Sequence, residues 1–186
     1  MKKIILFTLA VFTFSVSGYA QKYFTKSGKI TFDATASSSP EQIEAVNRSA
    51  TAVIDIKTGA IQFSVLVKGF SFERALMEEH FNENYMESNK FPKSEFKGTI
   101  ANNTTVDYSK DGTYNVKVQG KLTIHGVTKD INTDGKLVIQ GGKINATADF
   151  NVLLTDYGIS IPGLVADKVG KTAKISVNCS LELFKG

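Results

Sequence analysis

The chain is poor in the residues that build disulfide frameworks and metal centres. Its 186 residues include one cysteine, two histidines and no tryptophan. The single cysteine, Cys179, excludes an internal disulfide and lies far from any position where a lipid anchor would be attached. His80 and His125 lack the ligand spacing that zinc or copper requires. We therefore expect no metal site and no cofactor, with His80 a hydrogen-bonded structural residue and His125 a turn residue.

Residue groups that form a nucleophilic active site are also missing. Ser160 lacks the sequence context of a nucleophile elbow, and Cys179 has no base placed near it in the sequence. The run from Gly170 to Thr172 is similar to the end of a phosphate-binding loop, but Val165 occupies the position where that loop needs glycine. The sequence therefore predicts no catalytic residues and a protein that is not an enzyme.

The first twenty residues have the composition of a secretory signal peptide. Lys2 and Lys3 precede an apolar run over residues 4–16, and the small residues Gly18 and Ala20 stand where a signal peptidase cleaves. A retained membrane anchor is the alternative, which the short apolar run disfavours. We therefore predict a signal peptide over 1–20 and a mature domain over 21–186 that is soluble and either periplasmic or secreted.

The expected mature chain has nearly balanced charge. Without the two N-terminal lysines, 20 basic residues remain against 18 acidic ones. So small an excess gives no reason to expect nucleic-acid binding. A length of about 165 residues is enough for one domain that buries a sizeable core or encloses a cavity.

Apolar and polar residues alternate along most of the mature chain, which is typical of strands with one apolar and one solvated face. Short turn signals, such as Asp111 followed by Gly112, join neighbouring strands and favour antiparallel pairing. About eight strands emerge, and an up-and-down barrel closes all of their edges. We therefore predict an all-β, eight-stranded antiparallel barrel with one or two short helices.

The stretch around His125 and Gly126 predicts a β-hairpin. A two-residue loop formed by these residues places Lys121 opposite Asp130, which is a favourable pair of opposite charges. A loop of three residues is the alternative. The two-residue loop also pairs Thr123 with Thr128 and Leu122 with Lys129.

Three segments interrupt the strand pattern. Ser39, Pro40 and Glu41 predict a capped helix that runs to about Asn47. Residues 155–171 predict an irregular loop at a barrel mouth. A third segment predicts an amphipathic helix that either plugs a cavity or merely packs on the barrel. Its apolar positions are Phe72, Leu76, Met77, His80, Phe81 and Tyr85.

The expected barrel interior includes several small residues. Gly98, Gly120, Ala146 and Ala148 all fall on the inward parity of their strands. Small inward residues leave room behind a wall of valine, isoleucine, leucine and phenylalanine. The pattern alone is compatible with an internal cavity and equally with a filled core.

Three blocks of the chain resemble the YceI-like family. They are the hairpin over residues 122–129, the segment 74–96 with its histidine, aromatic, proline and phenylalanine positions, and the end of the chain over 146–154, 156–158 and 175–183, which resembles the last two strands of the family and the loop between them. Tyr85 and Met86 replace the usual aromatic pair, an early histidine is missing, and residues 36–49 look like an insertion. The chain also lacks the Gly-x-Trp signature of true lipocalins. The resemblance implies a lipocalin-like barrel that binds a polyisoprenoid, such as a quinone tail or prenyl lipid, without catalysis.

Our leading hypothesis is an exported carrier that buries an isoprenoid lipid in the barrel. A non-catalytic envelope-stress or interaction module with a filled barrel is the alternative, and a lipid-modifying enzyme is the least favoured. Expected partners are the lipid, a transient membrane or membrane-protein contact and a second copy of the chain in a homodimer. The expected lining comprises Phe63, Val65, Val67, Phe96, Val116, Val118, Leu122, Phe150, Val152, Val177 and Leu181, with Leu76, Phe81 and Tyr85 covering one side.

Overall fold

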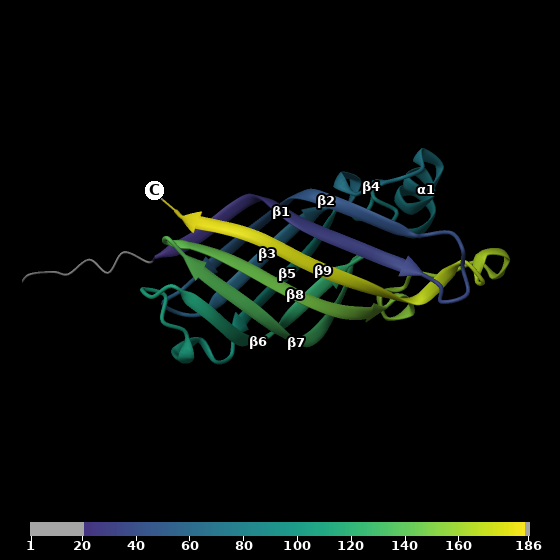
Figure 1. Ribbon diagram of the computed structural model, residues 1–186. Coiled ribbons are helices and arrows are strands. Elements are labelled where there is room, and N and C mark those ends of the chain that lie inside the picture. Colours follow the sequence, from purple (N-terminus) through teal and green to yellow (C-terminus); the bar gives the residue numbers. More distant parts are fainter. Residues whose placement is uncertain (1–20, 185–186) are drawn as a thin grey trace, which may run out of the picture.

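The computed structural model describes residues 21–184, which form a closed barrel of eight long antiparallel strands (Figure 1). The predicted signal peptide lies outside the described residues. The strands follow the order β1-β9-β8-β7-β6-β5-β3-β2, and pairing of β1 with β2 closes the sheet. The predicted fold class is therefore confirmed. The strands are β1 (Lys22–Thr35), β2 (Glu44–Asp55), β3 (Ala60–Leu66), the two-residue β4 (Ser71–Phe72), β5 (Lys93–Ile100), β6 (Gly112–Ile124), β7 (Val127–Gln140), β8 (Lys143–Leu153) and β9 (Val169–Leu183).

The side-chain alternation along each strand sets the inside and outside of the barrel. In β6, Val116 and Leu122 are buried, whereas Lys117 and Lys121 are exposed. Successive side chains of a strand point to opposite faces, so one parity forms the core and the other meets water. This division follows the predicted parity.

The hairpin between β6 and β7 has the predicted register. Lys121 pairs with Asp130, and its Nζ lies 3.0 Å from the Asp130 carboxylate. Both loop residues have positive φ, +50° for His125 and +75° for Gly126, which matches the twist of a two-residue hairpin loop. A Cβ on Gly126 would lie 2.5 Å from the Phe91 ring, so this turn requires glycine. The two-residue loop is therefore confirmed.

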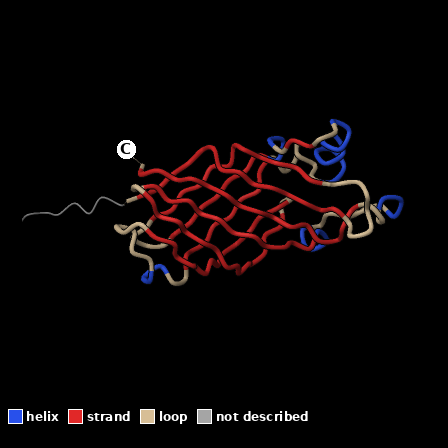
Figure 2. The backbone as a smooth tube through the Cα atoms, viewed as in Figure 1, coloured by secondary structure: helices blue, strands red, loops and turns tan. Residues whose placement is uncertain are grey.

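The two ends of the barrel differ in structure. The two ends of the described segment 21–184 and the turns after β2 and β7 gather at one end of the barrel, which we call the packed end (Figure 1). Most of the helical turns gather at the other end, which we call the mouth (Figure 2). Within residues 21–184, no helix is long and apolar enough to cross a membrane. The mouth elements are η1 (Val67–Gly69), α1 (Ala75–His80), η2 (Phe81–Tyr85), η4 (Leu154–Tyr157) and η5 (Gly163–Val165).

The barrel wall divides near the mouth, between β2 and β3. Only the second half of β2 pairs with β3, because its first half pairs with β4 instead. Asn47, fully buried on β2, donates a hydrogen bond from Nδ2 to the Leu66 carbonyl at 2.9 Å and so joins the two edges. The segment that contains α1 and η2 follows β4 and covers this division. A helix therefore exists in the predicted segment, as a short α-helix continued by a π-helical turn, but it begins at Ala75, and the predicted first apolar position, Phe72, belongs to β4.

The helix predicted from Ser39 to Asn47 is wrong. Residues 36–43 form a turn and a loop, and β2 begins at Glu44. The Ser39 hydroxyl accepts a hydrogen bond from the Glu41 N–H at 3.1 Å and donates one to the Glu41 carbonyl at 2.8 Å. Serine favours such local turns as readily as helix caps. The pairing of the following residues with β1 and β4 then fixes an extended backbone.

Close packing fills the space at the packed end. Ile54, Ile144 and Leu181 are completely buried there. A bulge in β1 brings Gly28 so close to Cys179 that a Cβ on the glycine would lie 2.5 Å from Sγ. The absence of a side chain at Gly28 is therefore a packing requirement at this end.

Candidate functional site

An apolar chamber of about 160 Å³ lies inside the barrel. Its wall reaches from Ile54 and Ile61 on the packed side to Tyr157 and Ile159 at the mouth. The accessible surface of this wall is almost wholly apolar. Such a wall excludes water from the chamber and favours hydrocarbon over polar solutes.

Ten of the fourteen predicted lining residues face this chamber. Val67 and Leu181 are completely buried and line neither the chamber nor the mouth pocket described below. The structure therefore does not place these two predicted residues in the lining. The ten that face the chamber are Phe63, Val65, Phe81, Phe96, Val116, Val118, Leu122, Phe150, Val152 and Val177.

The paired glycines of β5 and β6 do not leave the space that their size suggests. Gly98 pairs with Gly120 across the two strands. A Cβ on Gly98 would lie 2.5 Å from Cζ of Phe96, and one on Gly120 would lie 2.8 Å from the same atom. The Phe96 ring therefore lies over both glycines. Ala146 and Ala148 do line the chamber, as predicted.

A second cavity of about 300 Å³, the mouth pocket, lies beside the chamber at the barrel mouth. It is lined by α1 and η2, by the loop before β2 and by the segment that leads into β9. Leu76 and Tyr85, predicted to cover one side of the site, contribute to this pocket rather than to the chamber. The two cavities together fall within the range of about 300–1,000 Å³ that is usual for small-molecule sites.

Phe81 lines both the chamber and the mouth pocket, as do Phe32, Met86, Leu154 and Ile159. Its ring lies 5.6 Å from that of Phe32, 5.7 Å from that of Phe70 and 5.0 Å from that of Phe72, measured between centroids. Tilted aromatic pairs at these distances add to the stability from apolar burial. Phe81 belongs to the short η2 turn rather than to a strand, so its backbone lies outside the hydrogen-bonded sheet.

Two residues that line the chamber come from the first strand, where sequence reasoning selected none. Ile30 and Phe32 of β1 line the chamber, and Phe32 also lines the mouth pocket. The alternation of Ile30, Phe32 and Ala34 already indicated an inward face in the sequence. Phe70 lacked such a signal, because it follows the turn η1 rather than a strand.

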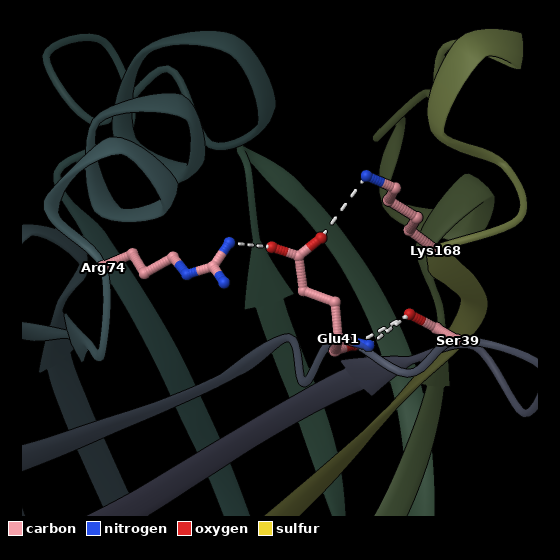
Figure 3. Close-up of polar contacts among 4 residues, drawn as sticks. All are labelled: Ser39, Glu41, Arg74 and Lys168. Atoms are coloured by element: carbon pink, nitrogen blue, oxygen red, sulfur yellow. Dashed lines mark hydrogen bonds and ion pairs between the residues drawn. The ribbon is translucent and has the colours of Figure 1, made fainter.

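Three charged side chains meet at the edge of the mouth pocket. The Glu41 carboxylate forms ion pairs with the Arg74 guanidinium and, at 3.4 Å, with the Lys168 ammonium (Figure 3). Glu41 precedes β2, Arg74 precedes α1, and Lys168 precedes β9, so the carboxylate connects three segments. The Ser39 turn described above fixes the backbone of Glu41.

The two histidines have different surroundings. His125 Nδ1 donates to the Tyr157 carbonyl at 3.1 Å, Nε2 lies 2.9 Å from the Glu87 carboxylate, and the ring packs edge-on against Phe91. It is thus a turn residue, as predicted, and also joins the hairpin to two mouth segments. The His80 side chain is exposed at the mouth pocket and makes no hydrogen bond within residues 21–184, so the predicted structural hydrogen bond is wrong.

The buried titratable groups near the chamber favour their neutral forms. Burial raises the pKa of the Cys179 thiol to about 11, which keeps it protonated at neutral pH. Burial, and secondly the charge of Asp156, raise the pKa of Tyr157. Within the described part of the chain, no three His, Cys, Asp or Glu side chains gather as metal ligands do. The arrangement suits the binding of an apolar molecule.

Comparisons with known proteins agree with this geometry. The sequence model of the YceI-like domain matches residues 6–181. A polyisoprenoid-binding domain from Saccharophagus degradans superimposes with a TM-score of 0.75 at 12% identity, over 89% of this chain and 99% of that one. BcnA from Burkholderia cenocepacia gives 0.66 at 14% identity, over 83% and 95% of the two chains. The YceI protein of Campylobacter jejuni gives 0.52 at 15% identity over the whole of both chains. No curated protein sequence matches this chain.

Proposed function

Because the chain belongs to the YceI-like family, we propose that it binds a polyisoprenoid lipid, such as a prenyl quinone, with the tail in the barrel chamber. The observation that carries this proposal is the apolar chamber that adjoins a mouth pocket, with Phe81 among the residues that line both. The resemblance in fold to a polyisoprenoid-binding domain supports it.

The energetics of burial suit such a ligand. Each methylene that leaves water contributes about 0.8 kcal/mol, so a long tail binds tightly with few polar contacts. The chamber alone holds only part of a long tail, since its volume of about 160 Å³ is below that of most ligand sites. A ligand of this length therefore occupies the mouth pocket as well and displaces the Phe81 ring.

The proposed role is carriage or sequestration after export, not chemistry on the lipid. Export rests on the signal peptide predicted over residues 1–20. N-terminal sequencing of the protein from a periplasmic or culture fraction tests it, and the expected first residue is Gln21. A protein that retains Met1 and remains in the cytoplasm would contradict export without affecting lipid binding.

Native mass spectrometry of the protein, purified without detergent, tests lipid binding. We expect an additional mass that corresponds to a prenyl lipid, and uptake of added prenyl quinone by the lipid-free form. Preparations that carry no lipid and that also fail to take up prenyl quinones would exclude the proposed function.

The small volume of the inner chamber also favours a second candidate, a non-catalytic interaction module whose barrel is a filled scaffold. Leu164, 96% exposed on η5, and Leu76 on α1 are large apolar residues that face solvent at the mouth. Under this alternative, substitutions that fill the chamber leave the binding of a partner at the mouth unchanged. Under the lipid-binding function, the same substitutions abolish uptake.

A further inference from the structure

The Glu41 carboxylate occupies the position of a bound anion at the edge of the mouth pocket. Its two oxygens are shared between Arg74 and Lys168, two cations from separate segments (Figure 3). The Glu41 side chain is 23% exposed, whereas those of Arg74 and Lys168 are 66% and 50% exposed. The carboxylate is thus largely withdrawn from water, while the two cations keep access to it.

The charged side chains that line the mouth pocket carry a net positive charge. Glu41 is the one acidic side chain among the described lining residues, against Arg74 and Lys168, with His80 as a further titratable group. Glu78, on the neighbouring α1 helix, accepts a hydrogen bond from the Phe72 N–H and does not line the pocket. The single negative charge of Glu41 therefore neutralises only one of the two positive charges of Arg74 and Lys168.

The same pocket continues into an apolar floor. Phe81, Met86 and Ile159 line both the mouth pocket and the chamber. A lipid whose tail enters the chamber past Phe81 must leave its headgroup in the mouth pocket. The headgroup then lies on the side of the pocket where the cations are.

We propose that the mouth pocket binds an anionic, phosphate-bearing lipid headgroup between Arg74 and Lys168, in place of the Glu41 carboxylate. The inference rests on the proposed lipid-binding function and adds the class of headgroup. A phosphate monoester carries about −1.5 to −2 charges at neutral pH and three acceptor oxygens, so it satisfies two cations better than one carboxylate does. The planar Arg74 guanidinium suits such oxygens because it donates two parallel hydrogen bonds.

Calorimetric titration of the purified, lipid-free protein tests the proposal. The probes are geranylgeranyl monophosphate, the uncharged alcohol geranylgeraniol and inorganic phosphate. We expect the monophosphate to bind more tightly than the alcohol, and its advantage to shrink as salt is added. Inorganic phosphate should bind far more weakly than either lipid, because it lacks a tail.

The variants Arg74→Gln and Lys168→Gln should each reduce the affinity ratio of monophosphate to alcohol about tenfold, which is the effect of losing one hydrogen bond to a charged group. Glu41→Gln should raise that ratio, because it removes the competing carboxylate. Lys121→Gln is the matched control, since Lys121 forms an exposed ion pair with Asp130 on the hairpin. It should leave the ratio unchanged. Affinity for the alcohol shows that each variant is folded.

Three results would overturn the inference. Equal binding of the two lipids would exclude a phosphate site while the lipid-binding function stands. A ratio that Arg74→Gln and Lys168→Gln leave unchanged would place the headgroup elsewhere, and inorganic phosphate that binds as tightly as the lipid would indicate a site for free phosphate. Failure of both lipids to bind would instead reject the proposed function, and the inference with it.

Discussion

The packed end and the mouth of this barrel are built from the same strands, but one is closely packed and the other borders the cavities. At the packed end, Ile54, Ile144 and Leu181 are completely buried. At the mouth, the wall divides, and short helical turns with exposed Leu76 and Leu164 cover it. Residues in close packing determine stability, whereas residues that border cavities determine access. Mutations at the two ends should therefore separate folding from binding.

The largest expected effect on stability is at the packed end. Leu181→Ala removes a completely buried side chain, and we expect a loss of about 2–5 kcal/mol in the free energy of unfolding. Denaturant unfolding monitored by circular dichroism measures it. Leu183→Ala on the same strand, where the side chain is 42% exposed, is the control and should lose less than about 1 kcal/mol. Equal losses in the two variants would contradict close packing at this end.

Alkaline pH should also act on the packed end. Burial raises the pKa of Cys179 from 9.0 to about 11, so the folded protein keeps the thiol proton over a range in which the unfolded chain releases it. The resulting stability is complete below about pH 9 and is lost as the pH rises through about 11. The loss should approach about 3 kcal/mol, since the pKa rises from 9.0 to about 11 and each pKa unit corresponds to about 1.4 kcal/mol.

Denaturant unfolding at a series of pH values, under reducing conditions, measures this loss. The variant Cys179→Ala lacks the thiol and should show a shallower decline in stability between pH 9 and 11 than the original chain. Parallel declines in the two proteins would show that the Cys179 thiol titrates normally.

The contact between Gly28 and Cys179 gives a somewhat smaller effect. Gly28→Ala places a Cβ 2.5 Å from the Cys179 sulfur, and we expect a loss of about 1–3 kcal/mol from overpacking. Combining it with Cys179→Ala should recover part of this loss, because the sulfur is gone. The recovery is partial, since the Ala50 carbonyl also lies 3.0 Å from the new Cβ. Strictly additive losses in a double-mutant cycle would show that the two residues do not interact.

At the mouth, a substitution at Phe81 should change stability little and the rate of lipid exchange strongly. Phe81→Leu keeps an apolar side chain, so we expect a loss of at most about 1.5 kcal/mol. A smaller side chain between chamber and pocket should speed both uptake and release of a prenyl lipid, measured by stopped-flow fluorescence with a labelled prenyl probe. Phe24→Leu, whose ring packs on Phe184 at the packed end, is the control. Equal rates of lipid exchange in the two variants would show that the Phe81 ring does not limit lipid entry and release.

Sequence patterns predicted the barrel better than the site. Alternation along β6 identified the inward face, and the charges of Lys121 and Asp130 identified the hairpin register, because both depend on neighbours in one or two strands. The helix predicted after Ser39 failed because pairing with β1 and β4 outweighs a local capping preference. The mouth pocket was not foreseen, since Glu41, Arg74 and Lys168 come together only through the closed fold.

The barrel interior also could not be predicted fully from sequence patterns. Gly98 and Gly120 predicted empty space from their size, yet the Phe96 ring of the same sheet lies over both. Leu181 has the inward parity of a lining residue, but it is completely buried and lines neither cavity. Parity predicts which way a side chain points. It does not predict how far the opposite wall lies from it.

Filling the chamber tests the central claim most directly. Ala148 on β8 lines the chamber opposite Gly135, whereas Asn151 on the same strand faces solvent. In the series Ala148→Val, Ala148→Leu and Ala148→Phe, we expect the affinity for geranylgeraniol, measured by calorimetric titration, to fall with each increase in size. Asn151→Phe should bind like the original chain. If folded Ala148→Phe binds the lipid with unchanged affinity, the tail does not lie in the barrel and the account is wrong.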